Sequence, residues 1–219
     1  MEIKLVSIAK SISSKSEKKH MTTSNFSTAT IGWVAIVTGV SAILAVIFLT
    51  LMATVNMSFG KVNDVFNGII GISSAILAWM LYAEYHAKAP LMSQIALTLA
   101  VVGAIFTIVG SVLIIYGFTD FVLAGWYTGV GNALIGLWLV AFCYSMQRGD
   151  ALPHNLIMFG LVVGAFMAVG LIGIPGIFAG IDSMESMSWY LYIAFFGYLG
   201  TYILYPIWTI WLGRNLLLK

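Results

Sequence analysis

Long apolar runs separated by short polar stretches fill the chain from residue 31 onward. Six such runs can be marked, at 31–53, 65–85, 91–116, 122–145, 155–179 and 189–212. Each is close to or above the roughly 20 residues that an α-helix needs to cross about 30 Å of hydrocarbon. The pattern predicts an all-α, polytopic transmembrane bundle of six helices. The short turns favour antiparallel packing of sequence neighbours.

The composition agrees with this pattern. Of 219 residues, 61% are hydrophobic and only 8% are charged, so lipid rather than water must solvate most of the surface. The formal net charge of +2 gives no reason to expect a nucleic-acid partner. The single cysteine, Cys143, excludes an internal disulfide and a cysteine metal cluster. The partner that composition predicts is the lipid bilayer.

Residues 1–30 form a polar, basic segment ahead of the predicted transmembrane domain at 31–219. Its lysines are Lys4, Lys10, Lys15, Lys18 and Lys19. One interpretation is an unstructured cytoplasmic tail that supplies positive charge. The other is an amphipathic segment lying on an anionic leaflet. Met21 is an alternative translation start.

The distribution of basic residues predicts the orientation. With a cytoplasmic amino terminus, the inner segments hold the tail lysines and Lys88, Arg148, Arg214 and Lys219. The outer loops then hold Lys61, with Asp64, Asp120, Asp182 and Glu185. Because lysine and arginine set topology, we expect both termini in the cytoplasm and a multi-pass protein of the inner (plasma) membrane.

A faint internal repeat accompanies the helices. The segment VVGAIF at 101–106 is similar to VVGAFM at 162–167, and each follows a turn with a proline, Pro90 or Pro153. The spacing near 60 residues suggests three tandem hairpins of the same orientation. Chance matching among apolar helices is the other interpretation.

The last third of the chain has a recognisable order of parts. LP precedes a glycine-rich helix, the acidic turn IDSMES follows, and then WY and a YP-containing helix that ends in LGR. This order resembles small six-helix bacterial integral membrane proteins of the domain-of-unknown-function type. The resemblance implies a six-helix fold and a bacterial or archaeal inner membrane, and it brings no activity or binding residue.

Prolines and glycines weaken the fifth and sixth helices. Pro175 and Pro206 should each kink or end a regular helix. Two neighbouring broken helices can open a cavity, as in transporters. We expect such a cavity between them, lined by Asn132, Tyr202 and Tyr205. For Asn132, a hydrogen bond to another helix is the simpler explanation.

A second candidate lies at the predicted cytoplasmic end. Glu84, His86 and His154 could form a polar pocket there. Alternatively, Glu84 only pairs with Lys88 at the helix end. On the outer side, Asp182 and Glu185, together with Asp64 and Asp120 of the other outer loops, are either solvated loop acids or part of a site for a hard cation.

The middles of all six runs contain no Asp, Glu, Lys, Arg or His. Ionisable groups deep in a bilayer are costly and usually functional, so this pattern disfavours a carboxylate-relay pump, a retinal protein and an intramembrane metalloprotease. We therefore expect no catalytic residues, no cofactor and no metal.

Small residues recur at helical spacing, at Gly160, Gly164 and Ala168 and at Gly125 and Gly129. This spacing lets helix backbones approach closely. We expect it to serve packing within the monomer rather than a dimer seam.

The expected function is that of a non-enzymatic accessory or stress-related membrane component that acts through a membrane-protein partner or a homo-oligomer. The alternative is a small-solute transporter or channel with the cavity between the fifth and sixth helices. A polar-lined cavity reaching into the membrane favours the transporter, and an exposed stripe of small residues favours the accessory subunit.

Overall fold

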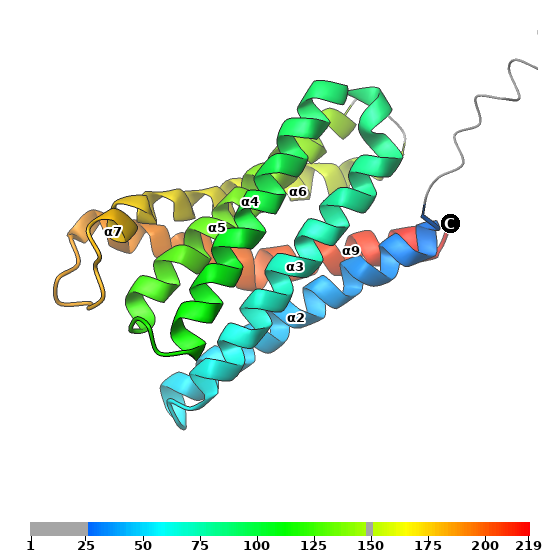
Figure 1. Ribbon diagram of the computed structural model, residues 1–219. Helices are drawn as coiled ribbons and strands as arrows, with labels where there is room; N and C mark the ends of the chain where they lie inside the picture. Colours follow the sequence, from blue (N-terminus) through cyan, green and yellow to red (C-terminus); the bar gives the residue numbers. More distant parts are fainter. Residues whose placement is uncertain (1–25, 148–150) are drawn as a thin grey trace, which may run out of the picture.

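In a computed structural model of the chain, residues 26–147 and 151–219 are described (Figure 1). Six helices in this part are long and apolar enough to cross a membrane: α2 (Thr28–Thr54), α3 (Phe59–Tyr85), α4 (Pro90–Ile115), α5 (Phe121–Met146), a fifth span His154–Phe178 and a sixth span Trp189–Leu217. This part of the chain is therefore all-helical, and the protein is a multi-pass membrane protein, as predicted. The lysines of residues 1–25, and Arg148, lie outside the described residues.

The largest difference from the predicted boundaries is at α3. This helix begins at Phe59 rather than at residue 65, so Asn63 and Asp64 are helical instead of lying in a loop. The polar residues of FGKVND lower the local hydropathy, but their amide and carboxyl groups turn inward rather than toward lipid. Mean hydropathy detects helical segments that face lipid, and it misses the start of a helix whose polar residues face the inside of the bundle.

The fifth and sixth spans are broken, as their prolines predicted. The fifth consists of α6 (His154–Ala168), the 3-10 turn η3 (Val169–Gly173) and α7 (Ile174–Phe178), which carries Pro175. The sixth consists of the 3-10 segment η4 (Trp189–Phe195), α8 (Phe196–Leu199), the π-helical turn η5 (Gly200–Leu204) and α9 (Tyr205–Leu217).

The π-helical turn has a covalent cause. Pro206 has no N–H, so the usual helical hydrogen bond to the Tyr202 carbonyl is missing. The Tyr205 N–H bonds to the Gly200 carbonyl, one residue further back than in an α-helix. The sequence thus specifies an irregular backbone at Tyr202.

The helices pack largely in chain order. α2 contacts α3, α3 contacts α4, α4 contacts α5, and α5 contacts α6. The sixth span closes the bundle: α9 lies against α2, and α8 and η5 lie against α6 (Figure 1). The short 3-10 turn η2 (His86–Lys88) joins α3 to α4.

Three turns, at residues 55–58, 116–120 and 179–188, meet at one end of the bundle, which we call the distal end (Figure 1). The start of α2 and the carboxyl terminus lie at the opposite end, the terminal end. Gly117 and Gly180 close two distal helices in the left-handed conformation, with φ of 73° and 61°. Each forms the double hydrogen bond of a Schellman cap, which a side chain at that φ would strain.

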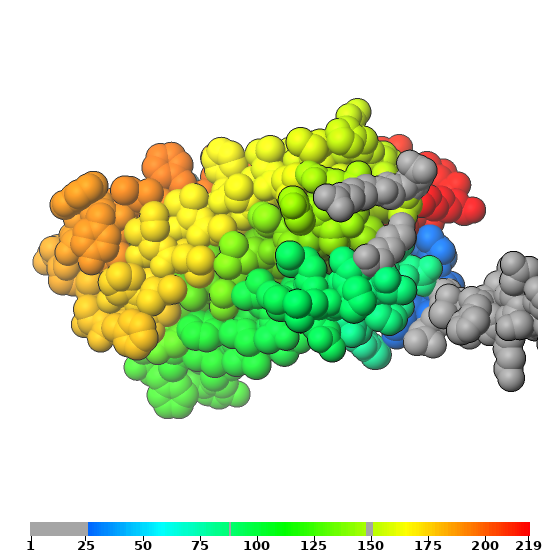
Figure 2. Space-filling view, turned by 90° about the horizontal axis from the view of Figure 1, so that it is seen from above, coloured from blue at the N-terminus to red at the C-terminus, as the bar shows by residue number. Residues whose placement is uncertain are grey.

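Close helix approach relies on the small residues, within the monomer as expected. A Cβ on Gly136 would lie 2.8 Å from the Gly164 carbonyl oxygen, and one on Gly164 would lie 2.5 Å from that of Gly136. Gly160 faces Cys143 and Trp208. The flanks carry exposed aliphatic side chains such as Val37, Ile47 and Ile105, and Figure 2 shows the elongated bundle that they cover.

Candidate functional site

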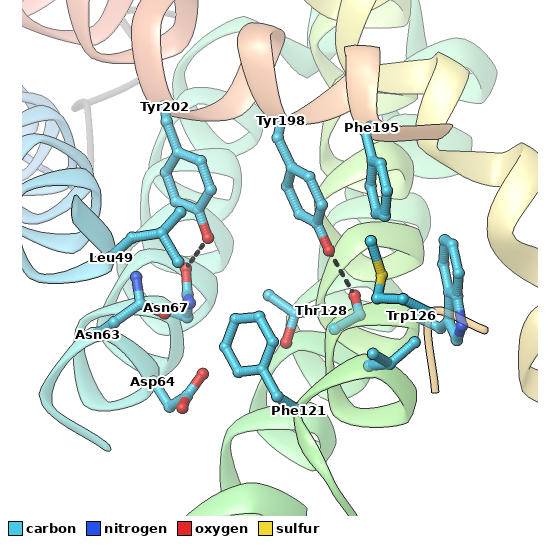
Figure 3. A pocket seen from close by; sticks show the side chains of 13 residues that line it. Leu49, Asn63, Asp64, Asn67, Phe121, Trp126, Thr128, Phe195, Tyr198 and Tyr202 are labelled. Atoms are coloured by element: carbon cyan, nitrogen blue, oxygen red, sulfur yellow. Dashed lines mark hydrogen bonds between the residues drawn. The ribbon is translucent and has the colours of Figure 1, made fainter. Parts of the chain in front are cut away.

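A cavity of about 150 Å³ lies in the distal half of the bundle (Figure 3). Its walls come from α2, α3, α5 and the sixth span, with one residue from the turn before Trp189. The lining residues are Leu49, Asn63, Asp64, Asn67, Phe121, Val122, Gly125, Trp126, Thr128, Met184, Phe195, Tyr198 and Tyr202.

The α3 wall is a row of buried amides. Asn63 and Asn67 are four residues apart, so they share one face of the helix. The Asn67 Nδ2 donates to Asn63 Oδ1 (3.0 Å), and the Asn63 Nδ2 donates to the Ala45 carbonyl of α2 (2.8 Å). The row therefore ties α3 to α2 and holds both side chains in fixed orientations.

Asp64 lies beside this row with only 5% of its surface exposed. Its Oδ2 has no hydrogen-bond partner, and no basic side chain of the described residues is among the groups that act on it. The interacting neighbour is the Asn67 amide. The interpretation of Asp64 as a solvated loop acid is wrong, because the early start of α3 places it inside the bundle. A buried carboxyl group without a counter-charge is costly to keep ionised.

The sixth span supplies an aromatic wall. Phe195, Tyr198 and Tyr202 stack in sequence, with ring centroids 5.9 Å and 5.7 Å apart. Trp126 of α5 continues the stack against Phe195, at 5.7 Å and an interplanar angle of 2°. The Tyr202 hydroxyl donates to Asn67 Oδ1 (2.9 Å), which connects the aromatic wall to the amide row (Figure 3).

The α5 wall makes room for these rings. The Tyr198 hydroxyl donates to the Gly125 carbonyl (2.9 Å), and a Cβ on Gly125 or Gly129 would lie 3.3 Å from that hydroxyl. Thr128 adds a buried hydroxyl to the cavity lining. The two glycines thus serve the placement of Tyr198 rather than a helix–helix seam.

Phe121 and Met184, both partly exposed, form the rim at the distal end. The turn that carries Met184 is fixed by Asp182. Its carboxylate accepts hydrogen bonds from the Asp120 N–H (2.8 Å) and the Leu123 N–H (2.9 Å). It therefore caps the start of α5 from a distant segment, a role for Asp182 that neither sequence interpretation included.

The predicted cavity residues are only partly brought together. Tyr202 lines the cavity, but Asn132 and Tyr205 do not, and neither does the fifth span. Tyr205 pairs instead with Ser74 (2.9 Å between hydroxyls), deeper in the bundle. Asn132 lies one turn beyond Thr128 on α5, is buried, and neither its Nδ2 nor its Oδ1 has a partner. The cross-helix bond expected of Asn132 is thus not formed.

The second predicted group does not form a pocket. Glu84, His86 and His154 are all exposed. The His86 ring stacks on Tyr82, and its Nδ1 lies 3.0 Å from the Tyr82 carbonyl oxygen. The cavity of about 10 Å³ near this end is lined by other residues, Tyr82 and Tyr85 among them.

Sequence reasoning missed Asn63, Asp64 and Asn67. A signal was present, because Asn63, Asn67, Gly71 and Ser74 fall at i, i+4, i+8 and i+11 and so mark one inward face. Extending the second helix back along this face would have reached Asn63.

Comparisons of the chain with protein-family models, with curated proteins and with solved structures give no match. The function is therefore argued from the chemistry of the site.

Proposed function

We propose that the protein is a small-solute transporter of the inner membrane, and that the distal cavity is its solute-binding site. The observation that carries this proposal is the buried hydrogen-bonded row of Tyr202, Asn67 and Asn63 in the wall of a 150 Å³ cavity. In a purely structural helix bundle such a cavity would only lower the stability of the fold, because polar groups in hydrocarbon need partners and empty volume is destabilising.

The depth of the cavity supports this assignment. α3 has 27 residues, or about 40 Å at 1.5 Å per residue, so each end extends about 5 Å beyond a 30 Å hydrocarbon core if the helix is centred. Asp64 then lies about 2 Å, and Asn67 about 7 Å, inside the core. With both termini cytoplasmic, as the basic residues predict, the cavity opens to the outside.

Polar contacts continue inward from the cavity. The Ser74–Tyr205 pair lies about 10 Å further along α3, on the same face as Asn67. Asn132 approaches from α5 with an unpaired amide. These groups mark a route along which a solute could move once the helices part, and the irregular sixth span lines its length.

The accessory-subunit alternative receives less support. Gly125, Gly129, Gly160 and Gly164 are all occupied by contacts within the monomer. An enzyme is not favoured either, because Glu84, His86 and His154 are all exposed.

Uptake into proteoliposomes tests the proposal. The purified protein should raise the initial uptake rate of at least one class in a panel of labelled cationic, neutral and anionic solutes. Asn67→Ala should abolish that uptake, and Asn215→Ala, which removes a half-buried asparagine near the end of α9, should leave it unchanged. Melting curves for both variants separate lost function from lost folding. No uptake of any class by folded wild-type protein would refute a transporter.

Reporter fusions test the orientation separately. Reporters placed after Lys88 and after Lys219 should both indicate the cytoplasm, and one placed in the 179–188 turn should indicate the outside. The opposite result would move the cavity mouth to the cytoplasmic face.

A further inference from the structure

We propose that the solute is a small organic cation whose ammonium group binds between Asp64 and the aromatic wall. This inference rests on the proposed function and names its substrate class. The charge expected of the solute follows from Asp64. Among the residues that line the cavity, Asp64 is the one Asp, Glu, Lys, Arg or His. Its Oδ2 is buried and without a partner.

A charge at this depth is stabilised by an opposite charge, and the described part of the protein supplies none. The lysine nearest in sequence, Lys61, is exposed. A bound cation would supply the positive charge that Asp64 lacks. Anions are disfavoured by the same carboxylate, and zwitterions lack a basic partner for their acidic end.

The aromatic wall selects among cations. Rings of Trp126, Phe195, Tyr198 and Tyr202 stand side by side, and Phe121 lies across the cavity near Asp64 (Figure 3). Aromatic side chains attract ammonium groups, and a site with little water favours organic cations, which are weakly hydrated, over metal ions. Metal ions need more than one carboxylate in most sites, and the described residues contain no group of three His, Cys, Asp or Glu side chains.

The volume sets the size of the ligand. A dry protein cavity of 150 Å³ holds a molecule as large as benzene, with about six heavy atoms. Methylated and hydroxyalkyl ammonium ions fall in this range. The amides of Asn63 and Asn67 and the hydroxyl of Thr128 can accept or donate to a single hydroxyl on such a ligand.

The distal end would also concentrate cations. The described residues there include Asp120, Asp182 and Glu185 at the surface, with Lys61 as the basic counterpart. A cavity mouth with net negative charge raises the local concentration of cationic ligands.

A matched pair of ligands tests the charge without any mutation. Choline and 3,3-dimethyl-1-butanol have nearly the same shape and differ in the charge of the quaternary centre. Calorimetry on the detergent-solubilised wild type should show choline binding at least about tenfold more tightly than the alcohol. Equal affinities, or tighter binding of the alcohol, would overturn the proposal.

Variants then locate the charge. Asp64→Asn should weaken choline binding at least about tenfold and leave the alcohol unchanged, because only the ammonium loses its counter-charge. Glu84→Gln is the control, since it removes an exposed acid at the other end of α3, away from the cavity. If Asp64→Asn does not fold, the choline–alcohol comparison on the wild type still decides. Choline binding that survives in folded Asp64→Asn protein would place the site elsewhere.

Two further outcomes are distinguishable. Competition of choline by equimolar sodium or potassium would replace the organic cation with a metal ion and refute the aromatic assignment. Specific uptake of a neutral or anionic solute, without any binding of ammonium ions, would refute this inference and leave the transporter proposal standing. Failure of every solute would refute both.

Discussion

The distal and terminal halves of the bundle are built from the same kinds of residue and differ in how they fill their centre. Between its helices the distal half leaves a cavity of about 150 Å³, and the terminal half leaves one of about 10 Å³ between α3, α4 and α5. The larger hollow of the terminal half, about 340 Å³, is a groove on the outer side of α2 and α9 that is lined mostly by exposed side chains such as Ile43, Ile207 and Trp211. In the terminal half, Trp208 and Trp138 pack edge to face, and the Trp208 indole donates to the Leu156 carbonyl (3.1 Å). In the distal half, the aromatic rings stack along one wall.

The backbone of the sixth span explains the difference. α9 is regular and lies against α2, where Gly39 and Gly213 allow close contact. On the distal side of α9, the sixth span contains a π-helical turn and a 3-10 segment, which place Tyr202, Tyr198 and Phe195 along one wall. Helix regularity, more than composition, thus decides which half is closed.

The largest effect is expected at a close backbone contact of the closed half. Gly136→Val should prevent folding or destabilise by about 3 kcal/mol, because its Cβ would meet Met167 and the Gly164 carbonyl. Gly125→Ala, whose Cβ would lie 3.3 Å from the Tyr198 hydroxyl, should cost far less. Melting temperatures in detergent compare them, and equal losses would contradict the contrast between the halves.

A gain is expected at the border between the halves. Asn132 is buried with both amide atoms unpaired, so Asn132→Leu should stabilise the protein by about 1–2 kcal/mol. Denaturant titration measures the change. If the variant is more stable and uptake is normal, Asn132 has no part in transport; a folded variant without uptake would place it on the solute route.

Two tyrosines offer a matched pair across the border. Tyr205→Phe removes the hydroxyl bonded to Ser74 and should cost about 1 kcal/mol of stability with little effect on solute binding. Tyr202→Phe removes the hydroxyl bonded to Asn67, so its main effect should be weaker binding. Isothermal titration and melting on both variants give the comparison, and identical profiles would argue against a distinct distal site.

The smallest effect is expected at the rim. Asp182→Asn loses the charge that caps α5 and should cost at most about 1 kcal/mol. Because the capped turn carries Met184, amide hydrogen exchange in the 179–188 turn should rise more than in the 116–120 turn. Unchanged exchange would mean that other contacts hold the turn.

Much of the fold was predictable because lipid imposes a simple rule on exposed helix faces. Five of the six predicted runs begin within a few residues of the observed helices, and both prolines interrupt their spans as predicted. The site was harder. Tyr202 was found from its proline, but Asn63, Asp64 and Asn67 look like loop residues to any measure that averages hydropathy, since it cannot tell an inward polar face from a solvated turn.

The failed cytoplasmic group has a geometric reason. Glu84 and His86 are two residues apart at the end of α3, where side chains point to roughly opposite sides of a helix. The closeness of Glu84 and His86 in the sequence therefore does not predict that they share a pocket.

The π-helical turn at Gly200–Leu204 has a mechanical consequence. A helix resists bending because each carbonyl is held four residues on, and this ladder is already rearranged here. We expect that the distal segment of the sixth span, with Tyr198 and Phe195, can tilt about this turn while α9 stays packed against α2. The π-helical turn would then act as a hinge within the sixth span, and the segment that moves would be the aromatic wall of the cavity.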